Sequence, residues 1–96
     1  MIRLLIVADD LTGALDTGVQ FAKRGVKTLI TTDADIDLLS IDDGIEVLSV
    51  DTETRHKDAD EAYGAVYSLV KRSIAFEISV RIVSFIRSSR NTHRVR

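Results

Sequence analysis

Two adjacent carboxylates, Asp9 and Asp10, follow a short apolar run near the start of the chain, within the stretch ADDLTGALDTG. A further aspartate, Asp51, follows a second apolar run and opens the stretch DTETR. Carboxylates accept hydrogen bonds without donating any, which suits the binding of hydroxyl groups or cations. Because neighbouring carboxylates repel each other, at least one of the pair should be solvated, cap a helix, or contact a cation or hydroxyl donors.

A purely structural role for the same stretch stays open. Asp10 or Thr12 would serve as the N-cap of a helix that starts near Leu11, accepting its first amide hydrogens. Asp16 would then be favoured by the helix dipole in the first turns. The free amides at such a helix start could also receive an anion.

Few of the other polar residues indicate a defined site. Arg55 is either a solvated surface charge or a bidentate partner for a carboxylate or phosphate. His56 and His93 lack metal-ligand spacing, so we predict that both lie on the surface. Gly13 and Gly18 form neither G-x-G-x-x-G nor a Walker A loop, so no nucleotide-phosphate loop is recognisable.

Hydrophobic periodicity predicts the elements that position these residues. Continuous apolar or β-branched runs indicate strands, and three- and four-residue spacings indicate helices. The expected elements are, in order, strand 3–8, helix 11–24, strand 26–32, a helical turn within an acidic loop at 36–39, strand 46–50, helix 58–73 and strand 80–86.

Each predicted helix has an apolar face. On the first helix, this face holds Leu11, Ala14, Leu15, Gly18, Val19 and Ala22, and Gly25 follows where a helix stop is expected. On the second helix, it holds Ala59, Ala62, Tyr63, Val66, Leu69 and Val70.

This alternation predicts parallel strands with right-handed crossovers, and hence an α/β fold: a parallel-sheet, layered, Rossmann-like partial domain. The loops that leave the carboxyl ends of parallel strands gather at one edge, where ligands bind. We therefore expect Asp9 and Asp10 to face the same crevice as residues 51–55.

Composition limits the possible classes of protein. The 96 residues allow one domain, and 45% hydrophobic with 29% charged residues is typical of a folded globular chain. Cysteine is absent, which excludes disulfides and thiolate metal sites and suits a reducing cytoplasm. The apolar run at 4–8 is too short for a signal peptide or a membrane span, so we expect a cytoplasmic protein.

Charge divides the chain into two parts. Residues 1–70 carry 6 Lys and Arg against 14 Asp and Glu, a net of −8, whereas residues 71–96 carry 7 against 1, a net of +6. This change predicts a boundary near residue 75, between a folded part at 1–75 and a divergent basic tail at 76–96.

The stretches ADDLTGALDTG and VLSVDTETRH, about 40 residues apart, resemble the N-terminal part of the four-carbon acid sugar kinase family. The resemblance continues through EAYGAVYSLVKRS and covers roughly residues 1–75. It implies a two-domain enzyme that transfers the γ-phosphate of ATP to a hydroxyl of erythronate, threonate or a related tetronate. In such enzymes the N-terminal domain holds the acid sugar and the C-terminal domain holds the nucleotide.

The resemblance also implies roles for individual residues. Asp9 and Asp10 would accept hydrogen bonds from sugar hydroxyls, Thr12 and Gly13 would shape the loop, and Arg55 would bind the substrate carboxylate. The expected substrate-binding set is Asp9, Asp10, Thr12, Gly13, Asp16 and Arg55. ATP and Mg²⁺ would be bound by the second domain, so residues 1–96 are expected to hold neither.

The sequence departs from the family after the second helix. A segment similar to Lys-Lys-Thr-Asp-Ser-Thr-Leu-Arg-Gly is expected there, and the basic tail stands in its place. We expect a truncated product, with a frame change near codons 76–85 that translation of the downstream DNA would test. Such a chain would bind sugar acid without kinase turnover and would self-associate through an exposed sheet edge.

Other classes of function are also considered. A receiver-like signalling domain places an acidic pair after its first strand and an aspartate, here Asp51, after its third, around Mg²⁺. A haloacid-dehalogenase-type phosphatase is excluded because its D-x-D-x-T motif would place Ala8 at the nucleophile. The arginines of the basic tail could contact nucleic acid, but no aromatic residues are interleaved to support that interpretation.

Overall fold

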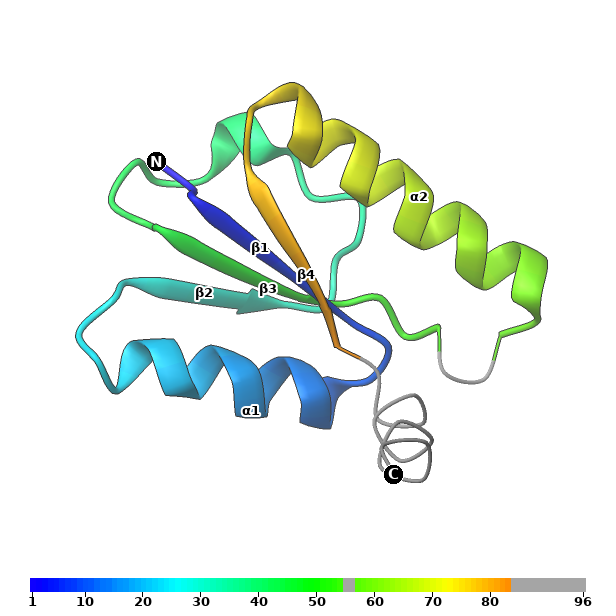
Figure 1. Cartoon of the computed structure of the whole chain (residues 1–96), viewed down its shortest axis with the longest axis horizontal. Helices are drawn as coiled ribbons and strands as arrows, with labels where there is room; N and C mark the ends of the chain where they lie inside the picture. Colours follow the sequence, from blue (N-terminus) through cyan, green and yellow to red (C-terminus); the bar gives the residue numbers. More distant parts are fainter. Residues whose placement is uncertain (55–56, 84–96) are drawn as a thin grey trace, which may run out of the picture.

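The computed structural model describes residues 1–54 and 57–83 of the chain. Figure 1 shows strands and helices that alternate along the sequence. The elements are β1 (Leu4–Ala8), α1 (Leu11–Ala22), β2 (Thr28–Thr31), the 3₁₀ turn η1 (Leu38–Ser40), β3 (Val47–Asp51), α2 (Ala59–Ala75) and β4 (Ser79–Val83). The predicted fourth strand is therefore present, although residues 84–86 of its predicted range lie outside the described residues.

The four strands form one parallel sheet in the order β2-β3-β1-β4. The central pair runs in register from Leu4 opposite Val47 to Ala8 opposite Asp51. On the other side of β1, Ala8 pairs with Val83 of β4. These pairings confirm the predicted α/β fold with a parallel sheet.

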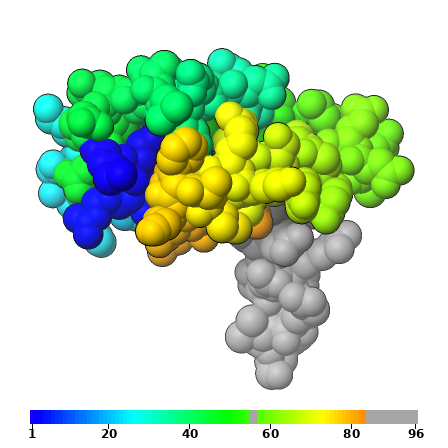
Figure 2. Space-filling view, turned by 90° about the horizontal axis from the view of Figure 1, so that it is seen from above, coloured from blue at the N-terminus to red at the C-terminus, as the bar shows by residue number. Residues whose placement is uncertain are grey.

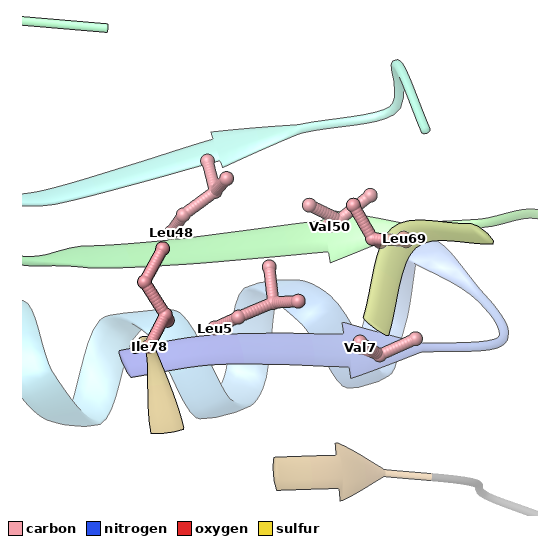
Figure 3. Packing of buried hydrophobic residues seen from close by; sticks show 6 residues of the cluster. All are labelled: Leu5, Val7, Leu48, Val50, Leu69 and Ile78. Carbon is pink, nitrogen blue, oxygen red and sulfur yellow. The ribbon is translucent and has the colours of Figure 1, made fainter. Parts of the chain in front are cut away.

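The two helices cover opposite faces of the sheet, as Figure 1 shows. On the α1 face, the buried hydroxyl of Ser49 donates to the carbonyl of Ala14 at 2.8 Å. The opposite face carries the main core, in which Leu69 of α2 packs onto alternate residues of the central strands. Figure 3 shows the cluster, which consists of Leu5, Val7, Leu48, Val50, Leu69 and Ile78.

Small residues allow α1 to approach the sheet closely. A Cβ atom on Gly18 would lie 2.9 Å from Cδ1 of Ile30, which is closer than side chains approach each other. After the helix, Gly25 has a φ of 82°, in the left-handed region that glycine adopts most readily. The helix stop predicted at Gly25 is confirmed.

The predicted apolar face of α1 is partly wrong. Ala14 and Gly18 are buried, but Leu11, Leu15 and Val19 are 46%, 41% and 39% exposed. The reason is that the helix contacts the sheet through its smallest residues, and the close approach leaves the larger side chains beside the contact.

The predicted face of α2 is also only partly correct. Leu69 is fully buried and Val66 packs against the core, whereas Tyr63 is 69% exposed. Figure 1 shows the amino-terminal half of α2, to which Tyr63 belongs, extending past the sheet. Its ring stacks instead on Tyr67, with the ring centroids 5.7 Å apart.

Arg72 fastens α2 to the acidic segment between β2 and β3. Its guanidinium donates to the carbonyls of Ile36 and Ala34 at 2.7 and 2.6 Å. In Figure 2 this segment, in cyan and green, lies alongside the yellow helix. None of the helices that the structure describes is both long and apolar enough to cross a membrane.

Candidate functional site

The loops after β1 and β3 leave the sheet at the same edge. Ala8, the last residue of β1, pairs with Asp51, the last residue of β3. Asp9 and Asp10 therefore lie next to residues 52–54, and we call these five residues the carboxyl edge. The shared edge that the sequence predicted is confirmed.

The connections that follow β1 and β3 also favour this edge as a ligand-binding site. β1 leads into α1 on one face of the sheet, and β3 leads into α2 on the other face. Where neighbouring strands send their connections to opposite faces, the loops diverge and leave room for a ligand between them.

Asp10 is the N-cap of α1. Its Oδ1 accepts a hydrogen bond from the amide of Gly13 at 2.8 Å, and its backbone is extended at φ −147° and ψ 168°. The predicted capping role is therefore confirmed for Asp10, and Thr12 is an exposed residue of the first helical turn. The same bond fixes the direction of the Asp10 carboxylate, while Asp9 beside it is half-buried.

Gly13 lies in a tight place between the helix start and the sheet. A Cβ atom there would be 3.2 Å from Oδ1 of Asp10, 3.5 Å from Cβ of Ala8 and 3.6 Å from Cγ1 of Val83. A side chain at this position would press on the capping carboxylate. Gly13 therefore allows α1 to begin directly beside β1 and β4.

Asp16 lies in the second turn of α1. Asp16 is the sixth residue of α1, and the first turn of this helix holds no acidic residue. Because the dipole effect fades beyond the first turn, it contributes little there. Asp16 is exposed and lines a groove with Thr17, Phe21 and Arg81, on the flank of α1 next to β4.

Asp51 has a structural role in the turn that follows β3. It is 3% exposed, and its Oδ1 accepts a hydrogen bond from the amide of Glu53 at 2.8 Å. This bond holds Glu53 at a φ of 55°, a left-handed conformation that is uncommon for residues other than glycine. Within residues 1–54 and 57–83, no three His, Cys, Asp or Glu side chains gather as a metal site.

Two buried threonines at this edge were not predicted from the sequence. The backbone amide and the hydroxyl of Thr52 both donate to the carbonyl of Ala8, each at 2.9 Å. The hydroxyls of Thr52 and Thr54 are 2.8 Å apart. Sequence reasoning missed them because their burial and their partners depend on the pairing of β1 with β3.

Arg55, the predicted partner of a substrate carboxylate, lies outside the described residues, as does His56. The structure therefore brings together Asp9, Asp10, Thr12 and Gly13 at one end of the sheet and places Asp16 farther along α1.

Comparison with known proteins decides the family. A family model described as a sugar-binding N-terminal domain matches residues 4–90. The chain belongs to this family. The match includes β4 and so extends past residue 75.

Two curated relatives of this sugar-binding domain are kinases. The chain is 39% identical over 66 residues to a D-threonate kinase of Salmonella typhimurium and to a D-erythronate kinase of Heliobacterium modesticaldum. The alignment covers 69% of this chain but 15% of each relative's length. The resemblance to four-carbon acid sugar kinases is thereby confirmed, and no solved structure matches the chain.

The fold explains why two separated stretches characterise this sugar-binding domain. ADDLTGALDTG forms the end of β1, the following loop and the first part of α1, whereas the described part of the second stretch, residues 47–54, contains β3 and the turn after it. Parallel pairing of β1 with β3 brings both stretches to the carboxyl edge.

Proposed function

We propose that the carboxyl edge binds a four-carbon sugar acid of the erythronate or threonate type. The main support is the register that pairs Ala8 with Asp51, because ADDLTGALDTG and VLSVDTETRH, the two stretches that resemble the family, begin on these paired strands. The names of the two relatives, a D-threonate kinase and a D-erythronate kinase, support this class of ligand.

The residue types at the edge suit such a ligand. A tetronate offers several hydroxyl donors and one carboxylate. Asp9 and Asp10 would accept hydrogen bonds from hydroxyls, and Arg55 would supply a cation for the carboxylate. Thr12 and Gly13 shape the loop that holds the two aspartates, whereas Asp16 lies on the flank of α1 next to β4 and not at this edge.

The proposal extends to the reaction in which this domain takes part. In the whole protein, the bound tetronate would receive a phosphoryl group from ATP, with Mg²⁺ held by a nucleotide-binding domain. Phosphoryl transfer needs cations arranged around the triphosphate. We therefore expect the 96-residue chain to bind the acid without phosphorylating it, and a coupled ADP-release assay with D-erythronate and D-threonate tests this expectation.

The binding experiment uses Asp10→Asn and isothermal titration with D-erythronate and D-threonate. Asparagine caps helices about as well as aspartate, so the melting temperature should change little. Loss of the charged acceptor should weaken binding roughly tenfold.

Asp37→Asn is the matched control. Asp37 caps η1 by accepting from the amide of Leu39 at 3.0 Å, and η1 lies near Met1 and Ile78, away from the carboxyl edge. This variant should bind like the unaltered chain. The proposed function fails if the unaltered chain binds neither acid.

A further inference from the structure

Thr52, the residue that follows β3, fixes the orientation of the peptide group between Ala8 and Asp9. The carbonyl oxygen of Ala8 accepts two hydrogen bonds, from the amide and from the hydroxyl of Thr52, each 2.9 Å long. Because a peptide group is planar, fixing the Ala8 carbonyl also fixes the amide nitrogen and Cα of Asp9. The backbone from which Asp9 extends is therefore oriented from the neighbouring strand.

The hydrogen bonds of the two threonines have a defined direction. A threonine hydroxyl has one hydrogen to donate, and that of Thr52 points to the Ala8 carbonyl. In the 2.8 Å contact between the two hydroxyls, Thr54 must therefore be the donor and Thr52 the acceptor. The result is a relay from Thr54 through Thr52 to Ala8, in which each bond strengthens the next.

Burial makes this relay sensitive to substitution. Thr52 and Thr54 are 4% and 7% exposed, so water cannot readily replace a lost hydroxyl. The turn at Glu53, held by the carboxylate of Asp51, returns the chain so that Thr54 meets Thr52.

We propose that Thr52 is a positioning residue for sugar-acid binding, held in place by Thr54. It acts through the Ala8 carbonyl, which sets the direction in which Asp9 and Asp10 leave β1, and it need not touch the ligand. The inference rests on the proposed function, because it assigns Thr52 to the same binding site.

The test compares Thr52→Val, which keeps the shape and removes the hydroxyl, with Thr52→Ser, which keeps the hydroxyl. Affinity for D-erythronate and D-threonate is measured by titration calorimetry, at a temperature well below the melting point of each variant. We expect Thr52→Val to bind roughly tenfold more weakly and Thr52→Ser to stay within about twofold of the unaltered chain. Thr54→Val, which keeps the bond from Thr52 to Ala8, should lose about threefold.

Thr28→Val is the matched control, because the Thr28 hydroxyl donates to the Val26 carbonyl at 3.0 Å at the opposite end of the sheet. It should leave the affinity unchanged. A second readout needs no ligand: in the NMR spectrum, the Ala8 carbonyl carbon and the Asp9 amide should shift in Thr52→Val and return in Thr52→Ser.

The outcomes separate the inference from the function on which it rests. If the unaltered chain binds a tetronate and Thr52→Val binds equally well, the positioning role is wrong and the proposed function stands. An equal loss of affinity in Thr28→Val would also overturn the inference, because the effect would then be general. If no tetronate binds the unaltered chain, the proposed function fails, and unshifted Ala8 and Asp9 signals in Thr52→Val would independently disprove the positioning.

Discussion

At the scale of single residues, Gly13 lies against the carboxylate that caps α1. A Cβ atom on residue 13 would be 3.2 Å from Oδ1 of Asp10, so Gly13→Ala requires that carboxylate to move by a few tenths of an ångström. Alanine favours the helix by about 1 kcal/mol, which should offset the contact and leave the free energy of unfolding nearly unchanged. The affinity for D-erythronate should nevertheless fall roughly fivefold, because the acceptor is displaced.

Gly64→Ala is the control for this effect. Gly64 lies inside α2, and a Cβ atom there would meet no atom within 4 Å. This variant should raise the free energy of unfolding by about 0.5 to 1 kcal/mol in urea denaturation, with no change in affinity. Gly13→Ala binding as tightly as Gly64→Ala would show that the exact position of the Asp10 carboxylate is unimportant.

Some residue roles could be predicted from the sequence and others could not. The Asp10 cap was predictable because capping depends on a local contact, here between residues that are three positions apart in the sequence. The hydrogen bonds from Thr52 to Ala8 could not be predicted, because these residues are 44 positions apart in the sequence and meet only through the register of β1 with β3. The roles of the two threonines at the carboxyl edge thus became visible only once the sheet was assembled.

At the scale of elements, the packing of α1 on β2 depends on Gly18. A Cβ atom at this position would lie 2.9 and 3.0 Å from two carbons of Ile30. Gly18→Ala should therefore lower the free energy of unfolding by about 1 to 3 kcal/mol, despite the better helix propensity of alanine. Urea denaturation followed by circular dichroism measures this change, and a stabilised variant would mean that Ile30 moves aside without cost.

The same contact explains where sequence periodicity succeeded and failed. The order of strands and helices was predictable because apolar runs and spacings are local patterns. The buried side of α1 was not, because Leu11, Leu15 and Val19 share the helical spacing of Ala14 and Gly18. The helix lies so close to the sheet that only its small residues fit between them. This distance is set by the packing on the sheet and cannot be inferred from the spacing of residues along the helix.

At the scale of the whole molecule, β4 is an outer strand of the sheet that the described residues form. Ile82 in β4 is 54% exposed, and Ile74 and Phe76, which precede the strand, are 63% and 43% exposed. An outer strand beside apolar side chains favours pairing with another strand. We propose that a second copy of this chain pairs with β4.

Light scattering after size-exclusion chromatography should then show a mass that rises from monomer to dimer with concentration. Ile82→Lys should shift the equilibrium toward monomer by roughly tenfold or more in dissociation constant, because a charged side chain on an outer strand opposes pairing. Val19→Lys is the control, since Val19 is 39% exposed on α1 next to Gly18, which faces Ile30 of β2 at the other edge of the sheet, and it should leave the equilibrium unchanged. A monomer at every concentration would disprove the pairing, and equal loss of dimer in both variants would place the contact elsewhere than β4.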